Sequence, residues 1–286
     1  MEARILLCSD LDRTILPNGA QPESPEARPL FRALTERDEV SLAYVSGRDL
    51  SLLQEAVESY QIPLPDYAIG DVGTTIYQVK NNCWVPWSEW SDEIAGDWGG
   101  KSHAELADLF ADVSLLRPQE DEKQNTFKLS YYTDTDIDQG LLLVEMEQRL
   151  AKKGIQASLI WSIDDAVGVG LIDVLPRCAT KVHAVRFLME HKNFREEQTV
   201  FSGDSGNDLP ALTSGMQAIL VKNARDEVRR LAKEGVEACG AKDKLYLAEG
   251  GFLGMNGNYS AGVLEGVAYF FPEARKWIKD AKQSLS

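Results

Sequence analysis

Short apolar runs alternate with longer amphipathic segments in the first 70 residues. The apolar runs are too short for helices and therefore predict buried strands. The segments between them have apolar side chains at helical spacing, and Ser24-Pro25 and Asp49 are typical of helix starts. This alternation predicts a parallel sheet. The predicted strands are 4–8, 40–45 and 67–70, and the predicted helices are 25–37 and 49–60.

The pattern changes after residue 70. Residues 72–79 can form a hairpin, and 83–100 is rich in tryptophan and acidic residues. Two helical and three strand-like segments follow, which predicts a small α/β domain inserted into the first one. We expect the insertion to comprise 83–173, and 1–82 with 174–286 to form the core. The expected elements of the insertion are helices 102–113 and 137–153 and strands 126–132, 155–162 and 169–176.

The strand and helix pattern of the first part resumes at Pro176. A helix is expected over 180–191, strands over 199–202 and 219–221, and two or three helices at the end of the chain. These segments predict that the parallel sheet continues after the insertion. The expected fold class is therefore α/β.

Composition excludes several classes of partner. A net charge of −15 and a pI of about 4.7 disfavour nonspecific binding to nucleic acid and to anionic membranes, so a phosphorylated substrate needs a local basic pocket. The four cysteines lack paired spacing, which favours free thiols in a reducing compartment. No apolar segment reaches membrane-spanning length and no signal peptide is recognised. We expect a cytoplasmic protein that is a monomer or a weak homo-oligomer.

Residues that bear chemistry stand at four predicted strand ends or helix starts. They are Asp10 with Asp12, Ser46-Gly47-Arg48, Lys181, and the run Gly-Asp-Ser-Gly-Asn-Asp at 203–208. In a parallel sheet these positions share one edge. A hydroxyl, helix N–H groups and an ammonium group can hold phosphate there. The carboxylates of Asp10, Asp204 and Asp208 supply hard oxygen ligands, which suit Mg²⁺.

Each motif alone has an ordinary explanation, such as an Asp-rich turn, a common turn at 46–48, a solvated lysine or a capped loop. Their joint occurrence in this order favours a phosphate site. A signalling receiver domain also combines clustered aspartates, a hydroxyl and a lysine, but the insertion and Asp12 argue against it. A carbohydrate-binding descendant without activity is disfavoured because the motifs are intact.

The four motifs resemble those of the haloacid dehalogenase superfamily of phosphatases, as DLDRT at 10–14, SGR at 46–48, Lys181 and GDSGND at 203–208. Within it, the chain is most similar to sucrose-phosphate phosphatases and related glycosyl-phosphate phosphatases. That likeness rests on LAYVSGR, PDYAIGDVGTTIY, RPQEDEKQNTFKLSYYTD and GDSGNDLPAL and covers most of the chain. It implies a Rossmann-like parallel-sheet core with an α/β cap inserted after the third strand.

The resemblance also implies a role for each core residue. The catalytic residues would be the nucleophile Asp10, the general acid/base Asp12, and the phosphoryl-holding Ser46 and Lys181. The metal ligands would be Asp10, Asp204 and the Asp12 carbonyl, with Asp208 orienting the site. The residues near the substrate would be Gly47, Arg48 and Asn207. Two positions depart from the common pattern: Arg13, where glycine is frequent, and Val182-His183, where a small residue often follows the lysine.

The insertion offers candidate sugar-binding residues on the same ground of resemblance. Lys128 on the alternating run 126–132 matches the lysine that the cap of sucrose-phosphate phosphatases presents to the sugar. Planar amides that also match are Gln119, Gln124 and Asn125, and Gly73 and Thr74 match a core loop that faces the cap. Tryptophans in 84–98 could stack on a sugar, although packing is the more common use of such residues.

The leading hypothesis is a Mg²⁺-dependent phosphatase that hydrolyses a sugar phosphate, such as the disaccharide phosphate sucrose-6-phosphate, through an aspartyl-phosphate. Alternatives within enzymes are a phosphatase of another sugar or glyceryl phosphate, for example a mannosyl-type osmolyte phosphate, and a phosphomutase. The expected partner is a small-molecule sugar phosphate, with no nucleic acid and no membrane.

Overall fold

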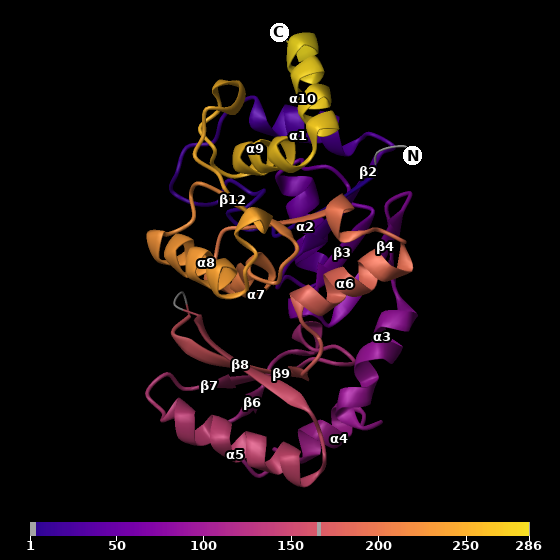
Figure 1. Cartoon of the computed structure of the whole chain (residues 1–286). Helices are drawn as coiled ribbons and strands as arrows, with labels where there is room; N and C mark the ends of the chain where they lie inside the picture. Colours follow the sequence, from indigo (N-terminus) through magenta and orange to yellow (C-terminus); the bar gives the residue numbers. More distant parts are fainter. Residues whose placement is uncertain (1–3, 165–166, 286) are drawn as a thin grey trace. The chain divides into compact units, whose positions relative to one another are not determined.

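The computed structural model describes residues 4–164 and 167–285, which form two compact units (Figure 1). The core unit comprises the described residues up to Gly70, Ile76–Val85, and those from Lys181 onward. The inserted unit comprises Asp71–Thr75 and Pro86–Thr180. The division into a catalytic core and a cap that selects the substrate stays a prediction.

A sheet that has eight strands among the described residues forms the centre of the core unit, in the order β12-β11-β10-β1-β2-β3-β4-β5. Neighbouring strands from β12 to β3 pair in parallel. This confirms the α/β class predicted from the alternating pattern. The strands are β1 (Ile5–Ser9), β2 (Val40–Val45), β3 (Tyr67–Gly70), β4 (Thr75–Lys80), β5 (Cys83–Pro86), β10 (Thr199–Gly203), β11 (Gln217–Leu220) and β12 (Leu245–Leu247).

Strand β1 lies in the middle of this sheet and is buried along its whole length. Leu7 pairs with Val200 of β10 on one side and with Leu42 of β2 on the other. Ile5 and Leu7 belong to a core cluster with residues of α1 (Ala27–Thr35), α2 (Leu50–Ser59), α9 (Ser260–Phe270) and α10 (Pro272–Leu285). Leu6 and Cys8 are fully buried on the opposite face, because side chains alternate along a strand. Burial on both faces explains the unbroken apolar run at the start of the chain.

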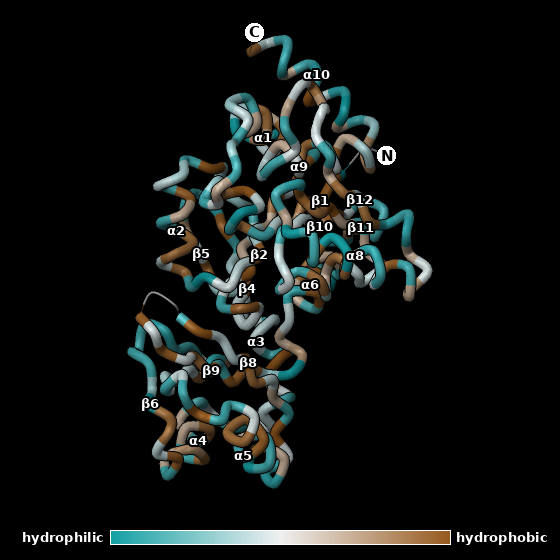
Figure 2. Tube along the Cα trace, turned by 90° about the vertical axis from the view of Figure 1, so that its left-hand side faces the viewer, coloured by the Kyte–Doolittle hydropathy of each residue, from teal (hydrophilic) through white to brown (hydrophobic). Residues whose placement is uncertain are grey.

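The helices of the core unit follow the predicted pattern, and hydrophobic stretches run through them and through the strands (Figure 2). Asp49 caps α2 as predicted, because its side chain accepts a hydrogen bond from the Leu52 N–H. The predicted start at Ser24-Pro25 is wrong: α1 begins at Ala27, and the Ser24 hydroxyl accepts from the Asn256 N–H instead. The helices are α1 (Ala27–Thr35), α2 (Leu50–Ser59), α6 (Lys181–His191), α7 (Leu209–Leu212), α8 (Asp226–Ala238), α9 (Ser260–Phe270) and α10 (Pro272–Leu285).

The expected hairpin within 72–79 is wrong. Residues Asp71–Gly73 form a short 3-10 turn, and β4 then runs unbroken to Lys80. The turn that joins β4 to β5 is Asn81-Asn82, and both residues have positive φ angles of 50° and 62°. Two asparagines tolerate this left-handed conformation better than most residues, and it matches the twist of a two-residue hairpin.

The inserted unit contains an antiparallel sheet of the order β6-β7-β9-β8, as far as the chain is described. Its apolar cluster is built from Leu129 and Tyr131 of β7, Ile172 and Val174 of β9, and residues of α4 and α5. The elements are α3 (Ser88–Ala95), α4 (His103–Asp108), β6 (Arg117–Pro118), β7 (Leu129–Thr133), α5 (Gln139–Lys152), β8 (Ala157–Asp164) and β9 (Val169–Pro176).

Two tryptophans of the inserted unit are packing residues. Trp90 and Trp98 are completely buried, and the Trp98 ring meets Phe127 edge-on with centroids 5.5 Å apart. Neither ring is therefore exposed to stack on a sugar. The four cysteines are free thiols in the structure. Among the described residues, no helix is both long enough and apolar enough to span a membrane.

Candidate active site

Asp10 follows β1 directly and stands at the carboxyl end of the central strand. Its backbone N–H donates to the Ser202 carbonyl of β10 at 2.9 Å, which extends the parallel pairing by one residue. Its side chain is almost fully buried, and Oδ1 accepts a hydrogen bond from Lys181 Nζ at 2.8 Å. The first motif is thus held in the protein interior against an ammonium group.

Lys181 is the first residue of α6 and joins two of the motifs. Its Nζ donates to Asp10 Oδ1 and to Asp208 Oδ1, each at 2.8 Å. Burial alone would lower the pKa of Lys181, but the negative charges of Asp10 and Asp208 raise it above its usual value. The lysine therefore stays charged at neutral pH.

The loop after β10 is shaped around the Asp208 side chain. Oδ2 of Asp208 accepts from the backbone N–H of Asp204 at 3.1 Å, and from the N–H and the hydroxyl of Ser205. A Cβ at Gly203 would lie 2.6 Å from Asp208 Cβ and Cγ, so a larger residue would collide there. This explains the glycine in the motif, and the hydrogen bonds hold the backbone of Asp204 and Ser205 against Asp208.

Asp10, Asp204 and Asp208 form an acidic group in which one carboxylate oxygen of each lies within 4.8 Å of the others. Burial and the charge of Asp208 raise the pKa of Asp10 to about 7, against the opposing effect of Lys181. The same two causes raise the pKa of Asp204 to about 6. Carboxylates that resist ionisation in this way gain from a bound cation. The donors are all oxygen, so the group fits a hard divalent ion such as Mg²⁺.

Asp12 points to a different partner. Its carboxylate accepts hydrogen bonds from Arg48 Nε at 2.9 Å and Arg48 Nη2 at 2.7 Å, and another from Asn18 Nδ2. Burial would raise the pKa of Asp12, but the hydrogen bonds and charge of Arg48 outweigh it and lower this pKa. The Asp12 carboxylate lies outside the acidic group. Any role of Asp12 as a metal ligand would thus involve its backbone carbonyl.

The remaining predicted core residues lie at two loops. Ser46 ends the β2 ladder: its N–H donates to the Ile69 carbonyl of β3, and its buried hydroxyl accepts from the Arg48 N–H at 3.2 Å. Gly47 and Asn207 are exposed. Ser46 and Arg48 are thus tied to each other and, through Arg48, to Asp12.

Two residues beside this site, Arg13 and Asn223, make contacts that the sequence did not predict. Arg13 has a φ angle of 61°, a left-handed conformation that costs a residue with a Cβ about 1–2 kcal/mol. Its Nε lies 3.1 Å from Asp204 Oδ2. Its carbonyl accepts from Nδ2 of the buried Asn223 at 2.6 Å. Arg13 could be noticed in the sequence, because glycine is frequent at this position of the first motif. No pattern in the sequence pointed to Asn223.

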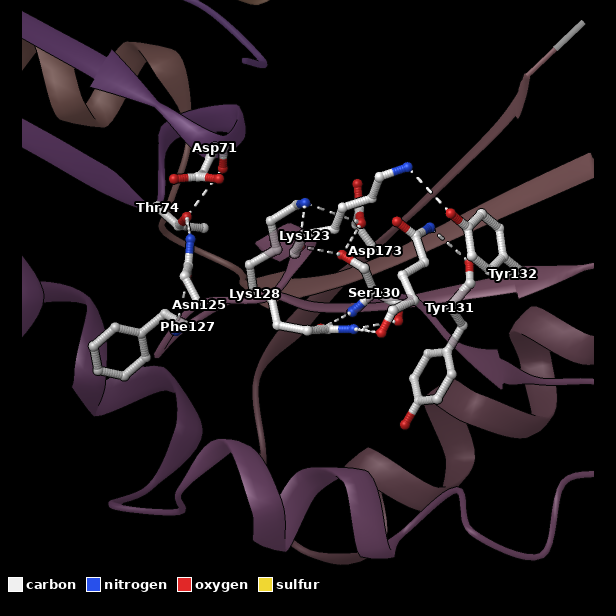
Figure 3. Close-up of polar contacts among 12 residues, drawn as sticks. Asp71, Thr74, Lys123, Asn125, Phe127, Lys128, Ser130, Tyr131, Tyr132 and Asp173 are labelled. Carbon is white, nitrogen blue, oxygen red and sulfur yellow. Dashed lines mark hydrogen bonds and ion pairs between the residues drawn. The ribbon is translucent and has the colours of Figure 1, made fainter. Parts of the chain in front are cut away.

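The predicted sugar-binding residues form internal hydrogen bonds within the inserted unit (Figure 3). Asn125 Nδ2 donates to the Thr74 hydroxyl at 3.0 Å, and Trp90 Nε1 donates to the Gly73 carbonyl. Gln119 Nε2 donates to the Tyr131 carbonyl, and Gln124 pairs with both backbone groups of Ser130. These side chains order the loop before β7, and their role toward a sugar stays a prediction.

Lys128 lies before β7 rather than inside a strand, because it closes a tight turn with Asn125. Its Nζ donates to the Lys123 carbonyl at 2.8 Å and lies 3.8 Å from Asp173 Oδ1, which also accepts from the Ser130 hydroxyl (Figure 3). The lysine is therefore held in place by its own unit. The predicted alternation at 127–129 is nevertheless kept, because Phe127 and Leu129 pack with the apolar cluster of the unit while Lys128 lies toward Asp173.

Relatives of known name match most of the chain. It is 56% identical over 283 residues to a HAD-like hydrolase of Nitrosococcus oceani. The aligned residues are 99% of this chain and 76% of that protein. It is 28% identical to sucrose-phosphatase 2 of Nicotiana tabacum, over 79% of this chain and 52% of that protein. It is also 28% identical to mannosylfructose-phosphate phosphatase of Agrobacterium fabrum, over 80% of this chain and 87% of that protein. The chain spans about half the length of the plant relative.

A solved structure shares the fold. The sucrose-phosphatase of Synechocystis sp. PCC6803, determined in complex with sucrose and phosphate, superposes with a TM-score of 0.67 and 24% sequence identity, over 93% of this chain and 98% of that one. The sequence profile of the family named sucrose-6F-phosphate phosphohydrolase matches residues 3–271. The chain is therefore a haloacid dehalogenase-like phosphatase that belongs to the sucrose-6F-phosphate phosphohydrolase family.

Proposed function

We propose that this enzyme hydrolyses a disaccharide phosphate such as sucrose-6-phosphate, with Mg²⁺ and through an aspartyl-phosphate on Asp10. The observation that carries the proposal is the buried junction at which Lys181 joins Asp10 to Asp208, with Asp204 alongside. The similarity to sucrose-phosphatases supports the choice of sugar. Its similarity to a mannosylfructose-phosphate phosphatase is equal in identity, so that class of disaccharide phosphate is the second candidate.

In the proposed reaction, an Asp10 carboxylate oxygen attacks phosphorus and the bond to the sugar oxygen breaks. Phosphate-monoester hydrolysis is among the slowest uncatalysed reactions, so a covalent step with fixed cations around the phosphoryl oxygens is a suitable route. Lys181 and Ser46 would hold those oxygens. Asp10, Asp204 and the Asp12 carbonyl would hold Mg²⁺, which supplies positive charge toward the phosphoryl group.

Asp12 would give a proton to the leaving sugar oxygen and later take one from the water that attacks phosphorus, breaks the bond to Asp10 and releases inorganic phosphate. Its low pKa in the unbound protein comes from Arg48, so Asp12 is ionised before substrate arrives. Arg48 is a predicted substrate residue, and a phosphate dianion would draw its guanidinium away from Asp12. The loss of this partner raises the pKa of Asp12 and favours the protonated acid that the first step needs.

Release of inorganic phosphate from a panel of sugar phosphates, with Mg²⁺ and with EDTA, tests the proposal. We expect turnover of disaccharide phosphates with Mg²⁺, loss of turnover in EDTA, and recovery when Mg²⁺ is added back. A phosphomutase would instead depend on a bisphosphate activator. Full activity in metal-free buffer would refute the proposed role of Asp204 as a metal ligand. Activity confined to monosaccharide or glyceryl phosphates would refute the proposal that the substrate is a disaccharide phosphate.

Replacement of Lys128 by Ala tests the cap assignment. An ammonium group has three donors; one serves the Lys123 carbonyl, and the charge of Asp173 lies 3.8 Å away. A remaining donor can serve a sugar hydroxyl. A hydrogen bond from a charged group contributes roughly 1.5–3 kcal/mol, so we expect kcat/KM for the disaccharide phosphate to fall about ten- to a hundredfold. Turnover of a small aryl phosphate, which has no sugar hydroxyls, should change little.

The matched control for this variant is Lys101→Ala. Lys101 is an exposed lysine of the same unit that pairs only with the helix residue Glu105 in the described structure. The Lys101→Ala variant should leave kcat/KM for the disaccharide phosphate and turnover of the aryl phosphate unchanged. Equal losses on both substrates for Lys128→Ala, or no loss on either, would remove Lys128 from the sugar site.

A further inference from the structure

The backbone of Arg13 is held in its left-handed conformation from several sides. Its N–H donates to Asn18 Oδ1 at 2.8 Å, and its carbonyl accepts from Asn223 Nδ2. Asn223 is fixed in turn, because its Oδ1 accepts from the N–H of Tyr259 at 2.8 Å. Strained residues of this kind persist where the surrounding structure determines them, and they gather at functional sites. The arginine is thus built into the loop.

This backbone directs the guanidinium at one carboxylate. Arg13 Nε lies 3.1 Å from Asp204 Oδ2, and the Asp204 side chain is only 5% exposed. Within the described structure this Nε makes no hydrogen bond, so charge alone attracts the two groups. Arg13 Nη2 donates to the Asn223 carbonyl at 3.4 Å. The side chain is one-third exposed overall, although Nε itself is buried.

Each carboxylate of the acidic group therefore has a cation supplied by the protein. Lys181 pairs with Asp10 and Asp208, and Arg13 pairs with Asp204. The two cations differ in attachment. Lys181 makes two hydrogen bonds and its side chain is 12% exposed, whereas the Arg13 side chain is 33% exposed and its Nε makes no hydrogen bond to Asp204. Of the two, Arg13 is the cation that an incoming ion displaces more easily.

We propose that Arg13 is a resident counter-cation of Asp204 that competes with Mg²⁺ for this carboxylate and so weakens the metal affinity of the site. The inference rests on the proposed Mg²⁺ site. The guanidinium and the metal are both positively charged, and both interact with the Asp204 carboxylate. Binding of the metal therefore forfeits the attraction between Arg13 and Asp204 and adds repulsion between the two cations.

Magnesium affinity of the purified chain, measured by calorimetry without substrate, tests this proposal. Arg13→Asn removes the charge, and asparagine tolerates the left-handed conformation. We expect Arg13→Asn to bind Mg²⁺ about tenfold more tightly than the unaltered chain. Arg13→Gly removes both charge and backbone strain and should show the same gain. Arg13→Lys retains the charge and should stay within about threefold of the unaltered chain.

A thermal-shift series gives a second readout that does not depend on activity. The rise in Tm between EDTA and a fixed Mg²⁺ concentration grows with affinity, and it compares each variant with itself. The rise should be larger for Arg13→Asn and Arg13→Gly. Lys222→Gln is the control for net charge, because Lys222 is exposed and precedes Asn223 in the same loop. It should leave the affinity unchanged.

The outcomes separate this inference from the proposed function. If the unaltered chain and all variants bind no Mg²⁺, the metal site itself is refuted. If the unaltered chain binds Mg²⁺ and both charge-removing variants bind it equally well or more weakly, Arg13 is no competitor and the inference alone fails. A gain shown by Arg13→Gly but not by Arg13→Asn would assign the effect to backbone strain and also overturn it.

Discussion

Replacement of Asp10 by Asn is expected to abolish phosphate release and leave the protein folded. The carboxylate oxygen that would attack phosphorus is lost, and an amide is a poor nucleophile. The fold should tolerate the change, because burial and neighbouring charges raise the pKa of Asp10 to about 7. Burial thus favours the neutral form of this side chain, asparagine is its neutral isostere, and Lys181 keeps its second partner Asp208.

The test measures phosphate release and melting temperature on the same preparation of Asp10→Asn. Asp12→Asn is the comparison, because proton transfer by a positioned side chain typically contributes 10²–10⁴-fold to a rate. It should slow the enzyme by about this factor. Substantial turnover by a folded Asp10→Asn protein would exclude the covalent mechanism. Equal and mild effects of both variants would leave neither residue its proposed role.

Replacement of Lys181 by Met should damage both stability and activity. The change leaves Asp10 and Asp208 buried without their shared cation, and loss of one partner of a buried ion pair typically costs about 3–5 kcal/mol. We expect a loss of this order in the free energy of unfolding, measured by urea denaturation in EDTA. Added Mg²⁺ should recover part of it, because the metal neutralises the same carboxylates.

Lys276→Met serves as the control, since Lys276 is an exposed residue of α10 and the substitution changes the net charge equally. Its stability should stay within about 0.5 kcal/mol of the unaltered chain. The activity of Lys181→Met should fall alike on a disaccharide phosphate and on an aryl phosphate, since this lysine would serve the phosphate itself. A normal unfolding free energy for Lys181→Met would contradict the ion-pair geometry described above.

Much of the core site could be predicted because its residues stand at strand ends and helix starts. A buried strand is recognisable from its apolar run, and parallel strands bring their carboxyl ends to one edge. Asp10, Lys181 and Asp208 could therefore be placed together from the sequence alone, and the structure joins them through two hydrogen bonds of 2.8 Å.

The inserted unit was harder to predict in detail. Periodicity predicted two helices and three strands, whereas the described residues of this unit form three helices and four strands. The surroundings of Lys128 did not follow from periodicity either. A turn closed by Asn125 and an ion pair with Asp173 decide where this ammonium group lies. Asp173 is 45 residues away in the sequence (173 − 128), on a strand of its own. Local patterns contain no information on such a pairing.

By itself, the sequence determined the class of fold and the meeting of Asp10, Asp204 and Asp208 with Lys181, because both depend on short-range periodicity and on the parallel arrangement that it implies. Only the tertiary structure decided which charges pair. It assigned Arg48 to Asp12, and Arg13 to Asp204 through a loop that Asn223 and Tyr259 hold. The reason is physical: an ion pair depends on the distance and burial of two side chains, and these are set by the packing of segments far apart in the chain.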